Sequence, residues 1–162
     1  MQFPDPLVKA QLVRRYKRFL ADAKLENGEI VTAHCANPGS MIGLTEPGAE
    51  IWLSPAQNPQ RKLRWSWEMI RVGKSLVGIN TLHPNKIVSD AIAKGLIPEL
   101  EGYNNMRREV KYGQSSRIDM FLEDPVKGSC FVEVKNVHLK RDAGAEFPDS
   151  VTARGTKHLC EL

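Results

Sequence analysis

The chain has 162 residues, of which 41% are hydrophobic, 26% charged and 7% aromatic, and its formal net charge is +4. These proportions are typical of a globular protein with a real core, and they exclude the collagen-like and disordered classes. No stretch approaches the roughly 20 apolar residues of a membrane-spanning helix, and the start lacks a signal-peptide pattern. We therefore expect a cytoplasmic protein with no membrane partner.

The first half of the sequence, residues 1–84, predicts short strands separated by turns. Turn signals include Asn37-Pro38-Gly39 and Glu46-Pro47-Gly48. Four or five strands at this spacing favour a small barrel or a sandwich, and an OB-like barrel is one candidate. The segments that carry the branched and aromatic residues are 7–20, 29–33, 51–53, 63–72 and 76–79.

This half also carries two signals that are typical of nucleic-acid binding. It has 11 basic and 7 acidic residues, whereas residues 85–162 have 12 of each, so all of the excess positive charge lies here. Clustered Lys and Arg attract phosphates, although a solvated basic surface is an equal alternative. Trp65 and Trp67 share one face of a strand, where a core position is favoured over a stacking platform for bases. The clustered basic residues are Arg14, Arg15, Lys17, Arg18, Arg61, Lys62 and Arg64.

The second half, residues 85–162, predicts an α/β arrangement. Apolar residues recur at helical spacing after Pro84, and Gly95 and Pro98 end this helix. Strands are expected over 106–112, 117–122 and 130–137. A polar loop follows, and a second helix is expected from Ser150 or Thr152.

An acidic pair lies on two of these strands. A hairpin centred on Val126 would place Asp119 directly opposite Glu133, with their Cβ atoms about 5 Å apart, and Lys135 on the same face. Opposed carboxylates destabilise a buried sheet unless a charge compensates them. Mg²⁺ would do so, because it accepts oxygen ligands from one or two carboxylates. The alternative is a metal-free arrangement in which the carboxylates pair with Lys135 and Arg117.

Several segments together resemble the sugar fermentation stimulation protein A (SfsA) family, in the same order and over essentially the whole chain. They are Ala33-His34-Cys35-Ala36-Asn37-Pro38-Gly39, Gly78-Ile79-Asn80-Thr81, Ser116-Arg117-Ile118-Asp119, Val132-Glu133-Val134-Lys135-Asn136-Val137, Phe147-Pro148-Asp149 and Thr152-Ala153-Arg154-Gly155-Thr156-Lys157-His158-Leu159.

This resemblance implies an OB-like domain over 1–84 and a PD-(D/E)XK nuclease-like α/β domain over 85–162. It implies DNA binding without sequence preference, a regulatory role in maltose metabolism, and Mg²⁺ or Mn²⁺ as cofactor. Asp119, Glu133 and Lys135 fall at the catalytic positions, and Glu109 is a further candidate ligand beside Asp119 and Glu133. Family members run beyond the helix expected from Thr152, so the second domain looks truncated, which favours a homodimer, domain swapping or marginal stability.

Three functions remain. The first is a DNA-binding protein that carries a nuclease-like site. The second is an active metal-dependent deoxyribonuclease, acting as an endonuclease or exonuclease. The third is a regulatory or interaction protein whose acidic pair is purely structural. The candidate phosphate contacts are Arg14, Arg15, Arg18, Arg61, Arg64, Arg117, Arg154 and Lys157.

Overall fold

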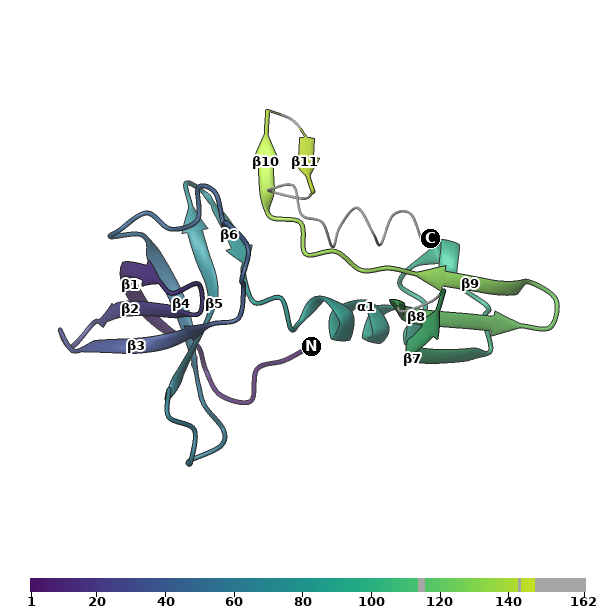
Figure 1. Cartoon of the computed structure of the whole chain (residues 1–162), viewed down its shortest axis with the longest axis horizontal. Coiled ribbons are helices and arrows are strands. Elements are labelled where there is room, and N and C mark those ends of the chain that lie inside the picture. Colours follow the sequence, from purple (N-terminus) through teal and green to yellow (C-terminus); the bar gives the residue numbers. More distant parts are fainter. Residues whose placement is uncertain (114–115, 143, 148–162) are drawn as a thin grey trace. The chain divides into compact units, whose positions relative to one another are not determined.

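The computed structural model describes residues 1–113, 116–142 and 144–147, and it divides the chain into two compact units (Figure 1). One unit contains Gln2–Thr81 together with the segment that begins at Asn136. The other contains Met1 and Leu82–Lys135. Among the described residues, no helix has both the length and the apolar character needed to span a membrane.

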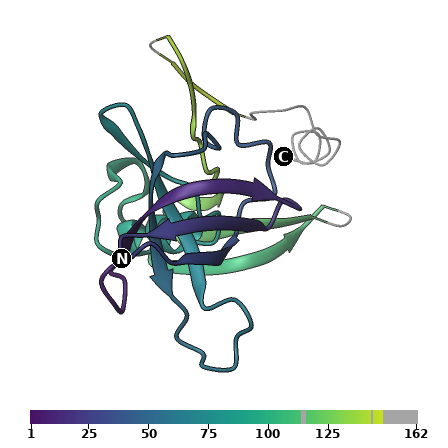
Figure 2. The same cartoon turned by 90° about the vertical axis from the view of Figure 1, so that its left-hand side faces the viewer.

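The first unit is a closed β-barrel. β1 pairs antiparallel with both β2 and β4, β2 pairs with β3, and β4 pairs with β5. A parallel pairing of β3 with β5 closes the ring in the order β1-β2-β3-β5-β4-β1, and β6 pairs antiparallel with β5. Figure 2 views the barrel strands from the left-hand side of Figure 1. The predicted OB-like barrel is therefore confirmed. Its strands are β1 (Val8–Tyr16), β2 (Leu20–Leu25), β3 (Ile30–Cys35), β4 (Glu50–Pro55), β5 (Trp65–Val72) and β6 (Ser75–Gly78).

Small and large apolar side chains fill the barrel interior. Trp67 is fully buried, and its indole Nε1 donates a 2.9 Å hydrogen bond to the carbonyl of Met69. Trp65 packs against the same core. The core position predicted for the two tryptophans is confirmed. The fully buried side chains around Trp67 include Ala21, Ala23, Ala33, Met41, Ile51 and Leu53.

The segment 7–20, which the sequence suggests as one stretch of mixed apolar and basic residues, is a strand, a tight turn and the start of a second strand. The turn lies at Lys17 and Arg18, whose φ angles are +49° and +63°. The turn spans three residues, Lys17–Phe19, between the paired Tyr16 and Leu20, and Gly or Asn usually supplies positive φ angles in such turns. Because neither residue is Gly or Asn here, the sequence carries no signal for this turn.

The barrel unit also contains a short hairpin where the sequence predicts a polar loop. β10 (Leu139–Arg141) pairs antiparallel with β11 (Gly144–Glu146). Strands of three residues are too short to show an alternating pattern, which is why the sequence does not reveal them.

The second unit is an antiparallel three-stranded sheet, in the order β7-β8-β9, preceded by one helix. The β8–β9 register pairs Met120 with Val132 and Leu122 with Cys130, so the hairpin predicted around Val126 is confirmed. The helix and strands are α1 (Pro84–Ala93), a 3-10 helix (Pro98–Leu100), β7 (Asn105–Tyr112), β8 (Ser116–Asp124) and β9 (Gly128–Val132).

The strand expected over 130–137 is shorter than predicted: β9 ends at Val132. The next amide that could continue it, that of Val134, donates instead to a side-chain oxygen of Asp119. The second helix, expected from Ser150 or Thr152, lies outside the described residues, as do Arg154 and Lys157.

Candidate functional site

Asp119 joins three segments of the second unit. It lies on β8 between the fully buried Ile118 and Met120, so its side chain projects from the opposite face of the sheet. Its Oδ1 accepts a 2.7 Å hydrogen bond from the Asn85 side-chain amide in the first turn of α1. Its Oδ2 accepts a 2.7 Å hydrogen bond from the backbone N–H of Val134. The carboxylate thus holds the segment that follows β9 against β8.

Glu133 and Lys135 lie in that segment and contact each other. Lys135 Nζ forms an ion pair with Glu133 Oε1, and the side chains are 38% and 14% exposed, respectively. The pairing of Lys135 with Glu133 agrees with the metal-free alternative, whereas Asp119 bonds to two amide groups. The structure therefore brings Glu133 and Lys135 into contact and ties their segment to Asp119 through the amide of Val134.

Glu109 does not form a larger cluster with Asp119 and Glu133. It is exposed on β7 at the register position opposite Asp119, between the pairs Arg108–Met120 and Val110–Ile118. Its φ of +53° interrupts the ladder at this position. Across the described part of the chain, no three His, Cys, Asp or Glu side chains gather in a group that could hold a metal ion.

The pair that remains, Asp119 and Glu133, is nevertheless a donor set that suits a hard divalent cation. Each oxygen of Asp119 accepts one hydrogen bond, which leaves a lone pair available on each. Mg²⁺ needs only one or two protein carboxylates, because waters and substrate phosphates supply its other ligands.

Among the predicted phosphate contacts on the barrel, Arg15 has an internal role. Its Nη2 donates to the carbonyl oxygens of Arg18, Asn37 and Gly39, at distances of 3.0, 2.8 and 2.9 Å. These bonds tie the turn around Pro38 to the end of β1. Arg15 therefore supports the barrel rather than presenting a guanidinium to a partner.

The remaining arginines differ in how much of the guanidinium is engaged. Arg14 forms an ion pair with Asp22 at 2.8 Å and lies over the Tyr16 ring. Arg61 donates to Ser66 Oγ at 2.8 Å and Arg64 to a backbone carbonyl at 2.6 Å. The side chains of Arg18, Arg64 and Arg117 are exposed.

The sequence patterns do not predict two features of the barrel. Glu68 is only 4% exposed, and its carboxylate accepts hydrogen bonds from Ser54 Oγ at 2.6 Å and Asn80 Nδ2 at 2.8 Å. An acidic residue in the middle of an apolar strand is the signal that points to it. Phe19 stacks on His34, fifteen positions along the chain, and no local pattern predicts this contact.

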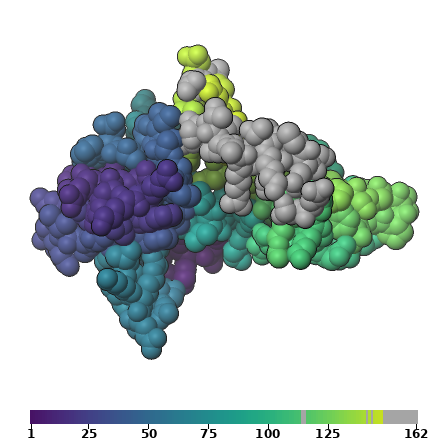
Figure 3. Space-filling view, viewed as in Figure 1, coloured from purple at the N-terminus to yellow at the C-terminus, as the bar shows by residue number. Residues whose placement is uncertain are grey.

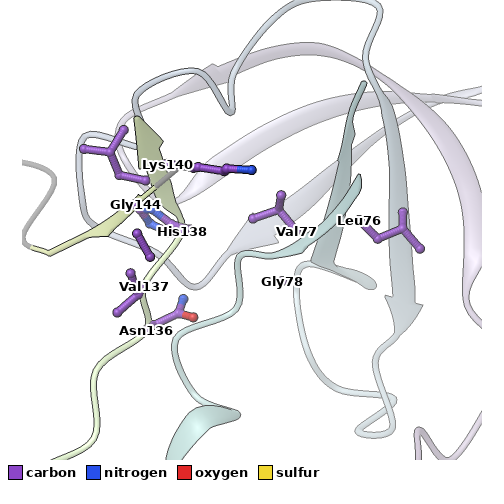
Figure 4. Close-up of a pocket in the computed structure, with 10 residues that line it drawn as sticks. Leu76, Val77, Gly78, Asn136, Val137, His138, Lys140 and Gly144 are labelled. Atoms are coloured by element: carbon purple, nitrogen blue, oxygen red, sulfur yellow. The ribbon is translucent and has the colours of Figure 1, made fainter. Parts of the chain in front are cut away.

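A groove of about 460 Å³ lies beside β6 and is lined on its other side by residues 136–140 and 144–145 (Figure 4). His138 Nε2 lies 3.1 Å from Asn37 Nδ2. The N–H of Gly39 donates a hydrogen bond to Asn37 Oδ1, so the side-chain amine of Asn37 faces the His138 ring. Asn136 Nδ2 is buried without a hydrogen-bond partner among the described residues.

Comparison with known proteins gives a match over both units. The family model described as "SfsA N-terminal OB domain" matches residues 13–79, and "Sugar fermentation stimulation protein RE domain" matches residues 82–162.

The relatives extend beyond the length of this chain. A "Sugar fermentation stimulation protein homolog" from Paramagnetospirillum magneticum is 60% identical over 162 residues, which are 100% of this chain and 69% of that protein. A homolog from Rhodospirillum rubrum is 56% identical over 173 residues, covering 100% of this chain and 71% of that protein.

A solved structure of the same family is also similar to this chain. The Pyrococcus furiosus SfsA, in complex with Ca²⁺, is 30% identical with a TM-score of 0.87, and the match covers 99% of this chain and 68% of that one. Both family models, the homologs and this structure give the same result. The chain belongs to the sugar fermentation stimulation protein (SfsA) family.

Proposed function

We propose that this chain binds DNA without sequence preference and that Asp119, Glu133 and Lys135 form a nuclease-like centre that uses Mg²⁺ or Mn²⁺. The observation that carries the centre is the hydrogen bond from the Val134 N–H to Asp119, because it holds the Glu133–Lys135 segment beside the Asp119 carboxylate. The relative solved in complex with Ca²⁺ supports a divalent-cation site in this family.

In this centre Asp119 and Glu133 hold the cation through carboxylate oxygens, and Glu109 is not required. A bound divalent cation supplies an acidified water and screens the charge of a phosphodiester. Asn85 keeps the Asp119 carboxylate oriented through its bond to Oδ1. Lys135, which is already held by Glu133, places a positive charge beside the attacking water.

DNA binding rests on the basic side chains that point to solvent. Arg18, Arg64 and Arg117 are exposed, and each can neutralise a phosphate without disturbing the core. Arg14 and Arg61 add charge while engaged with protein groups. Arg154 and Lys157 complete the proposed set from outside the described residues. A role in maltose regulation would act through this binding.

The test is the affinity for two labelled duplexes of unrelated sequence, measured by fluorescence anisotropy over a range of salt concentrations. The proposal expects equal affinities and a log affinity that falls linearly with log salt, because phosphate binding releases counterions. A flat salt response, or binding of one sequence only, contradicts it.

The second candidate is an active deoxyribonuclease, which the lone pair left on each oxygen of the Asp119 carboxylate favours. Plasmid DNA should then be cleaved with Mg²⁺ or Mn²⁺ and remain intact with EDTA. Asp119→Ala and Lys135→Ala should each abolish cleavage. Cleavage that survives in both variants excludes this centre as its source.

The third function, a purely structural acidic pair, is favoured by the ion pair between Glu133 and Lys135, which exists without a metal. It predicts that the chain binds neither DNA nor a divalent cation.

A further inference from the structure

Phe19 presents an aromatic ring to solvent in the β1–β2 turn, directly before the second barrel strand. Its side chain is 48% exposed, and its ring lies parallel to that of His34, with 6° between the planes and 6.5 Å between the centroids. The backbone fixes this pair, since the Phe19 carbonyl accepts a 2.8 Å hydrogen bond from the N–H of Cys35. The backbone pairing therefore holds the Phe19 ring parallel to the His34 ring.

His34 links the Phe19 ring to the β4–β5 connection. In the sheet register it lies beside Leu20 on β2 and beside Ser66 on β5. The Ser66 hydroxyl accepts a hydrogen bond from Arg61, which brings that guanidinium next to the imidazole. Burial, with a contribution from Arg61, lowers the pKa of His34 below 6.5, and Glu68 opposes this shift. The ring is consequently neutral at neutral pH and acts as an aromatic surface.

Positive charge lies in two loops next to Phe19 and His34. The β1–β2 turn contributes Lys17 and Arg18, and the β4–β5 connection, residues 56–64, contributes Arg61, Lys62 and Arg64. Neither segment contains Asp or Glu. The β4–β5 connection projects from the barrel as the blue-green loop at the bottom of the view (Figure 3).

The combination of a supported ring and basic loops fits one class of ligand. In OB barrels the face of strands 2 and 3, together with the loops 1–2 and 4–5, is the surface that can take up oligonucleotides. Aromatic rings bind single strands because unpaired bases expose their faces, while basic side chains follow the phosphates. A duplex keeps its bases stacked on each other, so it can use only the basic residues.

We propose that Phe19, supported by His34 and flanked by the basic residues of the two loops, is a base-stacking site that gives this chain a preference for single-stranded DNA. This inference rests on the proposed DNA binding and specifies the form of DNA that the barrel takes.

The experiment compares the affinities of wild-type chain and Phe19→Ala for a labelled oligothymidylate and for a duplex, at one salt concentration. Wild type should bind the single strand more tightly. Phe19→Ala should lose about 5- to 150-fold in single-strand affinity, the range expected for one base–aromatic stack. Its duplex affinity and its salt slope should stay unchanged, because the phosphate contacts remain.

Two further variants separate stacking from loss of apolar area. Phe19→Trp should retain single-strand affinity, whereas Phe19→Leu should lose it as the alanine variant does. Ile30→Ala is the matched control, because Ile30 is a 63% exposed side chain at the other end of β3, and it should bind like wild type. Circular dichroism of each variant verifies the fold.

The outcomes are distinguishable. If wild type binds no DNA of either form, the proposed function fails and this inference fails with it. If wild type binds DNA but Phe19→Ala keeps its single-strand affinity, or loses both affinities equally, only the stacking site is overturned. The same holds if Phe19→Leu binds like wild type.

Discussion

The backbone N–H of Val134 donates a 2.7 Å hydrogen bond to Oδ2 of Asp119, so a side chain takes up the amide at the point where β9 has ended. This bond replaces a ladder interaction with a link to a carboxylate, and it leaves Glu133 and Lys135 beside that carboxylate. The other oxygen of Asp119 is bonded to Asn85. The geometry of the centre therefore depends on one residue that is both structural and, in our proposal, a cation ligand.

Substitution of Asp119 should separate these two roles. Asp119→Ala removes both acceptors and leaves a partly buried N–H unsatisfied, so we expect the free energy of unfolding to fall by about 2–3 kcal/mol. Asp119→Asn retains one carbonyl acceptor and should lose about half as much. Urea denaturation measures both. Asn85→Ala, which removes only the bond to Oδ1, is the control. An alanine variant with the urea midpoint of wild type would show that the bond carries no stability.

Arg15 and Arg64 should behave oppositely when replaced by alanine. Arg15→Ala loses three hydrogen bonds to carbonyl oxygens and should lower the unfolding free energy by about 2 kcal/mol or more. Arg64→Ala should leave stability within about 0.5 kcal/mol of wild type and reduce the magnitude of the salt slope of DNA binding by about 1. Denaturation and anisotropy on the same two proteins check this. Equal effects on stability would contradict the separate roles assigned to them.

Asp22 should make stability depend on acidic pH. Burial raises the pKa of Asp22, but hydrogen bonds from Arg14, Thr32 and Tyr16 outweigh it and hold the pKa below 3.8. Because the folded pKa lies below the unfolded one, the contribution is complete above pH 3.8 and is lost as pH falls through the folded pKa. Asp22→Asn should be less stable than wild type near about pH 7 and should converge with it in strong acid. A stability difference that stays constant with pH would refute this.

His34 should titrate below its ordinary pKa of 6.5, with burial as the main cause. An NMR titration of its ring should give a midpoint under that value. Removing the nearby positive charge in Arg61→Ala should move the midpoint upward. A wild-type midpoint at or above 6.5 would contradict the partial burial of the ring.

Much of the architecture follows from sequence patterns. The alternation around Trp65 and Trp67 predicts a barrel strand, and the spacing after Pro84 predicts α1, which runs from Pro84 to Ala93. The turn centred on Val126 predicts the β8–β9 register, which the structure confirms from Asp124–Gly128 to Met120–Val132. These features depend on local periodicity and turn chemistry, which a sequence displays directly.

The rest depends on contacts that local patterns do not encode. The turn at Lys17 and Arg18 has positive φ angles without Gly or Asn, and β9 stops early because a side chain competes for the Val134 amide. The count of basic residues does not reveal that Arg15 is engaged by three carbonyl groups. The stack of Phe19 on His34 arises only when β2 and β3 pair.

The most direct test of the proposed centre is isothermal titration of Mn²⁺ into the chain and into three variants. Wild type should bind one ion per chain, and Asp119→Asn and Glu133→Gln should bind none. Glu109→Gln should match wild type, because the proposed centre holds the cation with Asp119 and Glu133 alone. Titration curves that are the same for wild type, Asp119→Asn and Glu133→Gln would show that these carboxylates do not hold a cation.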